Sequence, residues 1–154
     1  MNKKILHIDM DGVIADFSKE IKKISPNTDT NSFSVEVDDI CAKNPYIFHD
    51  LEPINDAIES VKELFNYFDI YFLSSPMWHV PESYIGKRIW LEKHFGQLAE
   101  KRLILTHRKD LVIGDYLVDD TIRHGVTEFK GEHIHFGNKK YPNWVNVMSY
   151  LRSL

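Results

Sequence analysis

The stretch that decides the fold is ILHIDMDGVIADF, residues 5–17. It begins with a short apolar run typical of a buried strand, and two aspartates, Asp9 and Asp11, follow at once. Carboxylates this close at a strand end repel each other. A hard cation such as Mg²⁺ relieves the repulsion because it prefers oxygen ligands, and Gly12 lets the backbone turn sharply beside it. An acidic turn or a calcium loop is the alternative, but the further acidic ligands of an EF-hand are missing.

Four more apolar runs downstream have the length and composition of strands. Together with the first run they cover residues 5–8, 70–73, 103–105, 116–118 and 133–136. Apolar residues recur at helical spacing near residues 57–65, 85–95 and 144–151. Strands that alternate with helices predict an α/β fold, in which a central, mostly parallel five-stranded sheet is covered on both sides.

One long segment, about residues 17–51, does not follow this alternation. A loop of this length without secondary structure would be unusual, so we expect a small helical cap inserted after the first strand. The chain then forms a single domain, residues 1–154, with a core of residues 1–16 and 52–154. Because the cap leaves the core beside Asp9 and Asp11, it should lie over them.

Polar residues follow the later strands as well, which is where parallel sheets place their active sites. Ser74 and Ser75 come after the second strand and can bind phosphate oxygens. Lys109 follows the third strand, where an ammonium group can offset charge on a transferring phosphate. Asp119 and Asp120 follow the fourth strand, and metal coordination would explain an acidic pair at the end of an apolar run.

Each of these signals also has a plain structural explanation. A serine pair before proline is a common way to leave a strand, a lone lysine is usually solvated, and an aspartate can cap a helix. The order of the signals argues for an enzyme, because an acidic pair, a hydroxyl, a lysine and a second acidic pair each follow a predicted strand.

Composition excludes some classes of protein. Hydrophobic residues make up 43% and charged residues 27%, and the net charge of -4 argues against binding of a nucleic acid polymer. Cys41 is the single cysteine, so no internal disulfide can form and we expect a reducing, cytoplasmic setting. No run reaches the roughly 18 apolar residues of a membrane helix, so we expect no membrane partner.

Taken together, residues 9–13 with Ser74, Lys109 and the pair Asp119-Asp120 resemble the four motifs of the haloacid dehalogenase (HAD) superfamily of phosphotransferases. Residues 9–17, 72–76, 90–96, 105–109 and 117–120 resemble more narrowly the 5′(3′)-deoxyribonucleotidases. The resemblance covers nearly the whole chain. It implies a HAD-like Rossmannoid three-layer sandwich with its small cap inserted after the first motif.

The resemblance also implies a reaction. Asp9 would attack phosphorus and form an aspartyl-phosphate, and Asp11 would act first as general acid and then as general base. The cofactor would be Mg²⁺, held by Asp9, by Asp11 through its backbone carbonyl and by Asp120, with Asp119 orienting the metal's surroundings.

The remaining implied residues concern the substrate. Ser74, Ser75 and Lys109 would hold the phosphate oxygens, and Phe17 would help form a nucleoside pocket. The expected substrate is therefore a small phosphate monoester, and more narrowly a deoxynucleoside monophosphate; the oligomeric state stays open. Two alternatives are a phosphatase of the same fold acting on a sugar phosphate or phosphoglycolate, and a non-catalytic nucleotide-binding protein.

Overall fold

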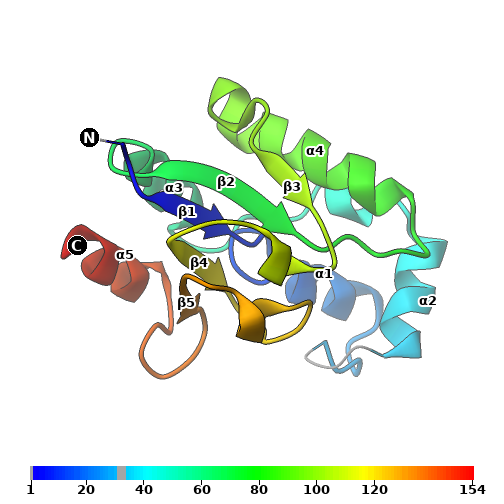
Figure 1. The fold of residues 1–154 in the computed structure, drawn as a ribbon. Coiled ribbons are helices and arrows are strands. Elements are labelled where there is room, and N and C mark those ends of the chain that lie inside the picture. The colour runs from blue at the N-terminus through cyan, green and yellow to red at the C-terminus, as the bar shows by residue number, and fades with distance from the viewer. Residues whose placement is uncertain (1, 31–33) are drawn as a thin grey trace.

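The computed structural model describes residues 2–30 and 34–154. In these residues five strands, all paired in parallel, form a central sheet in the order β3-β2-β1-β4-β5 (Figure 1). The strands are β1 (Ile5–Ile8), β2 (Asp69–Ser74), β3 (Leu103–Leu105), β4 (Tyr116–Asp119) and β5 (Glu132–His135). The predicted fold class is confirmed, and the strand ends differ from the prediction by at most one residue.

The first strand of the chain lies in the middle of the sheet. Leu6 and Ile8 are fully buried, and β1 pairs with β2 on one side and β4 on the other. A strand that is apolar over its length is suited to the interior of a parallel sheet. This position carries the acidic stretch after β1 to the centre of the sheet's carboxyl edge.

Helices and short 3-10 turns connect the strands. The α-helices are α1 (Phe17–Ile24), α2 (Val35–Lys43), α3 (Ala57–Leu64), α4 (Glu82–Phe95) and α5 (Trp144–Arg152). The 3-10 turns are η1 (Ile47–His49), η2 (Gly96–Ala99), η3 (Lys109–Leu111) and η4 (Val126–Glu128). Across the described residues, no helix has both the length and the apolar character needed to span a membrane.

The two faces of the sheet are covered differently. The larger apolar cluster joins Leu6 and Ile8 to buried side chains of α3, α4 and α5, among them Trp90 and Trp144. The smaller cluster on the opposite face is built around Leu73 and Leu117, together with residues on and near η4. The second face is therefore covered by short turns rather than by long helices.

The segment between β1 and α3 leaves and re-enters the core at one place. Ala15 bridges to Pro53, and the backbone N–H of Asp16 donates to the carbonyl of Glu52 at 2.8 Å. Between these points the chain forms α1, α2 and η1, which lie beyond the carboxyl ends of the strands (Figure 1). Residues 31–33 of this segment lie outside the described residues.

Candidate active site

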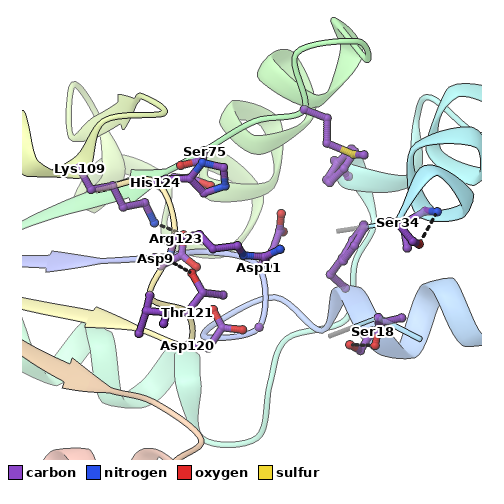
Figure 2. A pocket seen from close by; sticks show the side chains of 18 of the residues that line it. Asp9, Asp11, Ser18, Ser34, Ser75, Lys109, Asp120, Thr121, Arg123 and His124 are labelled. Atoms are coloured by element: carbon purple, nitrogen blue, oxygen red, sulfur yellow. Dashed lines mark hydrogen bonds and ion pairs between the residues drawn. The ribbon is translucent and has the colours of Figure 1, made fainter. Parts of the chain in front are cut away.

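A cavity of about 670 Å³ lies between the carboxyl ends of the strands and helices α1 and α2. Most of the residues predicted from the sequence line it, as Figure 2 shows for several of them. These lining residues are Asp9, Asp11, Phe17, Ser74, Ser75, Lys109 and Asp120. Asp119 is fully buried behind the cavity wall. Residues separated by up to 111 positions in the chain thus converge on one space because parallel strands end at the same edge.

Lys109 forms the charged centre of this wall. Its ammonium nitrogen lies 2.9 Å from Oδ1 of Asp9 and 2.5 Å from Oδ2 of Asp119, and only 2% of the residue is exposed. Burial alone would lower the pKa of Lys109, but the carboxylates of Asp9 and Asp119 outweigh it and raise that pKa. Lys109 is therefore a fixed cation that offsets the charge of Asp9.

Asp119 supports Lys109 and has no free carboxylate oxygen. Its Oδ2 accepts from Lys109, while its Oδ1 accepts from the backbone N–H of Thr121 at 2.9 Å and from the Thr121 hydroxyl at 3.2 Å. Burial and the nearby Asp9 raise the pKa of Asp119, in opposition to Lys109. Because its oxygens are already engaged, Asp119 is suited to holding Lys109 in place rather than to binding a ligand.

Asp120, in contrast to Asp119, has a buried carboxylate oxygen that can still bind a ligand. One oxygen each from Asp9, Asp119 and Asp120 lie within 4.8 Å of one another, and Oδ1 of Asp120 is buried without a hydrogen-bond partner. Burial, followed by the charges of Asp9 and Asp119, raises the pKa of the Asp120 carboxyl. A hard divalent cation fits this donor set, because it would bind the unpartnered oxygen and offset the clustered negative charge.

Gly12 makes this cluster sterically feasible. Its φ of +80° lies in the left-handed region, and a Cβ atom at this position would lie 2.2 Å from Oδ2 of Asp120. Glycine is the residue that tolerates both the backbone conformation and the close approach.

Asp11 faces the cavity but does not belong to the acidic cluster. Its Oδ2 lies 2.7 Å from the ammonium nitrogen of Lys87, on α4, and 26% of its side chain is exposed. Lys87 itself is 1% exposed. The carboxylate of Asp11 is therefore engaged by Lys87, and the prediction that Asp11 binds a metal through its backbone carbonyl stays a prediction.

The two serines after β2 differ in their availability. Ser75 donates its hydroxyl to the carbonyl of Thr106 at 2.7 Å, whereas Ser74 is 1% exposed and lines the cavity. The Ser74 hydroxyl is accordingly the better placed of the two to donate to an anion, and Ser75 can contribute its backbone N–H.

The wall formed by the segment between β1 and α3 combines aromatic and polar groups. The ring of Phe17 stacks on that of Phe48 with centroids 5.5 Å apart and an angle of 8° between the planes. Beside this pair the cavity is lined by Ser18, Thr30, Ser34 and Asp38. The wall thus offers one flat apolar surface and several hydrogen-bonding groups, which suits a flat heterocycle with polar edges.

The loop after β4 and His135 on β5 complete the cavity. Arg123 and His124 line it, and the carbonyl of His124, whose φ is 56°, accepts from the backbone N–H of Lys109 at 2.7 Å. His133 and His135 stack on β5, and their Nε2 atoms lie 2.9 Å and 3.1 Å from the carbonyls of Asp119 and Asp120. These contacts fix the backbone that carries the second acidic pair.

Lys87, Phe48 and Arg123 were not predicted from the sequence. Lys87 did leave a signal, since it lies on the buried stripe of α4 between Gly86 and Trp90, where a charged residue needs a buried partner. Phe48 and Arg123 lie in segments without periodicity, and only the folded chain brings them to the site.

Comparison with known proteins agrees with this geometry. The sequence pattern of the 5′ nucleotidase, deoxy (pyrimidine), cytosolic type C protein family matches residues 40–148. A protein of Vibrio phage KVP40 named as a 5′(3′)-deoxyribonucleotidase is 41% identical over 152 residues, which cover 99% of this chain and 86% of the phage protein.

Two solved structures share the fold. A haloacid dehalogenase-like hydrolase from Xanthomonas campestris has a TM-score of 0.65 and 10% identity, with 99% of this chain and 91% of that chain covered. A HAD hydrolase from Bacillus subtilis, crystallised with magnesium, has a TM-score of 0.60 and 11% identity, with 92% of each chain covered. From the family match and the phage relative together, the chain belongs to the 5′ nucleotidase, deoxy (pyrimidine), cytosolic type C protein family, and it is a phosphoric monoester hydrolase with a HAD-like fold.

Proposed function

We propose that this chain is a Mg²⁺-dependent 5′(3′)-deoxyribonucleotidase that dephosphorylates deoxynucleoside monophosphates through an aspartyl-phosphate at Asp9. The observation that carries the proposal is the pairing of Asp9 with the buried Lys109 at the floor of a cavity whose opposite wall is the Phe17–Phe48 pair. A phosphate can thus meet a nucleophile and a cation at one end, while a base stacks at the other. The phage relative's name supports the same substrate class.

The metal would be held by the carboxylates of Asp9 and Asp120 and by the backbone carbonyl of Asp11. When bound, Mg²⁺ would offset negative charge on the phosphate and on the clustered carboxylates. The unpartnered oxygen of Asp120 and the close approach of Gly12 support this assignment.

Side chains and backbone groups of the protein carry out the remaining steps. Asp9 attacks phosphorus while Asp11 gives a proton to the leaving ester oxygen, so that the nucleoside departs as an alcohol. Lys109, the Ser74 hydroxyl and the backbone N–H of Ser75 bind the phosphoryl oxygens. Asp11 then takes a proton from a water molecule, which attacks the phosphorus, releases inorganic phosphate and restores the Asp9 carboxylate.

Residues 17–51 form a small cap in this proposal, and residues 1–16 and 52–154 form the catalytic core. The cap supplies Phe17, Phe48 and the polar wall that selects the substrate. Cys41 lies buried inside the cap, which is consistent with a reducing, cytoplasmic environment.

The test is phosphate release from deoxy- and ribonucleoside monophosphates, sugar phosphates and phosphoglycolate, each with Mg²⁺ and with EDTA. We expect a preference for a deoxynucleotide that is lost in EDTA. Release from a sugar phosphate or phosphoglycolate alone would keep the core chemistry but reject the nucleotidase assignment.

The covalent step has its own test. Asp9→Asn should lower kcat by at least about 1,000-fold while the melting temperature in EDTA stays close to or above that of the wild type. Acid quenching of the wild-type enzyme during turnover should trap phosphate on Asp9, as read by mass spectrometry of peptides. Near-normal turnover by Asp9→Asn would rule out the covalent mechanism.

A further inference from the structure

Lys87 is a buried cation that the mechanism above does not use. It lies in the middle of α4 with 1% of its surface exposed, and its ammonium nitrogen is 2.7 Å from Oδ2 of Asp11. It does not line the cavity, whereas Asp11 does. Lys87 therefore reaches Asp11 from outside the space that the substrate would occupy.

The surroundings of Lys87 are apolar and closely packed. Gly86, Trp90 and Leu91 share its buried stripe on α4, and its ammonium nitrogen lies 5.3 Å from the centre of the Phe48 ring. Burying a lysine charge is costly unless it is paired, and an apolar side chain of similar volume often serves stability equally well or better. Packing alone thus gives no reason for a lysine here.

The packing does hold the ammonium group in one place. A Cβ atom on Gly86 would lie 2.7 Å from Cβ of Phe48, so the absence of a side chain at Gly86 lets η1 approach α4 closely. Phe48 then covers Lys87 on one side, while Asp11 engages it on the other. The second buried lysine, Lys109, is committed to Asp9 and Asp119, so the two lysines hold different carboxylates.

We propose that Lys87 is a positioning residue for the proton transfer made by Asp11, an inference that rests on the proposed function. By binding Oδ2 from outside the cavity, Lys87 holds the carboxyl group so that its other oxygen meets the leaving oxygen of the ester. As the phosphorus–oxygen bond breaks, the proton on that carboxyl oxygen passes to the leaving oxygen, and Lys87 keeps its own protons. Lys87 also contacts Phe48, so the position of the acid is tied to the aromatic wall of the substrate pocket.

Two phosphate esters with different leaving groups can distinguish a positioning role of Lys87 from a purely structural one. A nucleoside leaves as an alkoxide unless it receives a proton, whereas p-nitrophenolate leaves readily without one. Losing the position of a general acid should therefore matter for the first ester and much less for the second. The ratio kcat/KM covers the steps through the first irreversible one, which includes departure of the leaving group, so it reports this difference.

The variant to measure is Lys87→Met, which keeps most of the volume and removes the charge. Its control is Lys93→Met, on the same helix, where Lys93 makes an exposed pair with Asp50 at 3.4 Å. With saturating Mg²⁺, we expect Lys87→Met to lower kcat/KM for a deoxynucleoside monophosphate by about 100-fold, and for p-nitrophenyl phosphate by less than about 10-fold. Equal losses on the two esters would overturn the proposal.

A double-mutant cycle adds a second readout. If Lys87 acts through Asp11, then adding Lys87→Met to Asp11→Asn should change single-turnover nucleotide cleavage by less than about 3-fold, because the group it positions is already gone. A further 100-fold fall in that background would refute the positioning role. If Lys87→Met does not fold, as judged by its melting curve, Lys87→Gln is measured in the same way.

Failure of the proposed function would give a different result from failure of the Lys87 proposal. If the wild-type enzyme prefers another alkyl phosphate over nucleotides, the nucleotidase assignment fails, and the same comparison is made between that ester and p-nitrophenyl phosphate. The Lys87 proposal then stands or falls on the leaving-group difference alone.

Discussion

Replacing Asp120 by asparagine should make the metal-free protein more stable while removing its response to Mg²⁺. One oxygen each from Asp9, Asp119 and Asp120 lie within 4.8 Å of one another, and Lys109 contacts the first two but not the third. Two unit charges at the 4.8 Å limit of that cluster repel each other by about 3.5 kcal/mol at an effective dielectric constant of 20. Because Lys109 offsets part of this repulsion, we expect the free energy of unfolding to rise by about 1–3 kcal/mol, which corresponds to a rise in Tm of roughly 2–12 °C.

The pH dependence follows from the shifted pKa. Burial and the neighbouring carboxylates raise the pKa of Asp120 to about 8, from an ordinary value of 3.8. The folded state therefore binds more protons than the unfolded state between these values, and the wild-type protein loses stability as pH rises through that window. The advantage of Asp120→Asn should be small near pH 4 and largest at about pH 8.

The assay is thermal unfolding of both proteins in EDTA and in saturating Mg²⁺ across this pH range. Wild-type Tm should rise with Mg²⁺ as binding to the folded state requires, and the Asp120→Asn protein should show no such rise. The matched control is Asp38→Asn, because Asp38 lines the same cavity but is outside the acidic cluster. An Asp120→Asn protein that is no more stable than wild type in EDTA, and that still responds to Mg²⁺, would refute the reasoning.

Three further changes have definite expected outcomes. Gly12→Ala should abolish the Mg²⁺-dependent rise in Tm, because its Cβ would lie 2.2 Å from Oδ2 of Asp120; an unchanged rise would contradict this. Gly86→Ala should cost about 1–3 kcal/mol in urea unfolding, since its Cβ would lie 2.7 Å from Cβ of Phe48, and a neutral result would show that α4 and η1 separate freely. Burial lowers the pKa of His7 below 6.5, so the free energy of unfolding of the wild-type protein should fall as pH drops below that value. His7→Gln should reduce the slope of this free energy against pH by up to about 1.4 kcal/mol per pH unit. Equal slopes for the two proteins would show that His7 is not the source of this pH dependence.

Many of the residues at the carboxyl edge of the sheet could be predicted from the sequence, because their positions follow from where each apolar run ends. Apolar runs of strand length end at Ile8 and Leu73, and polar side chains that follow such runs in a parallel sheet must meet at one edge. This is why Asp9, Lys109 and Asp120 were identified as neighbours before the fold was known, and the structure places all three on one cavity. The alternation of the apolar runs with helical patterns predicted the five strands and their mostly parallel sheet.

The strength of each group's interactions depended on the tertiary structure. Asp119 and Asp120 are adjacent in sequence and are the same type of residue. Both carboxylate oxygens of Asp119 accept hydrogen bonds from Lys109 or Thr121, whereas Oδ1 of Asp120 has no hydrogen-bond partner. That difference arises from the direction in which each side chain leaves the end of β4, and sequence spacing does not encode it.

The sequence by itself determined the α/β fold, the position of the irregular segment after β1 and the set of carboxylates, hydroxyls and lysine at the strand ends, because these depend on short-range periodicity and on strand order. Only the tertiary structure decided that Lys87, 76 residues from Asp11, engages that carboxylate, and that Phe48 stacks on Phe17 in one wall of the cavity. These contacts depend on how closely η1 packs on α4, and such packing is a property of the whole folded chain rather than of any local stretch.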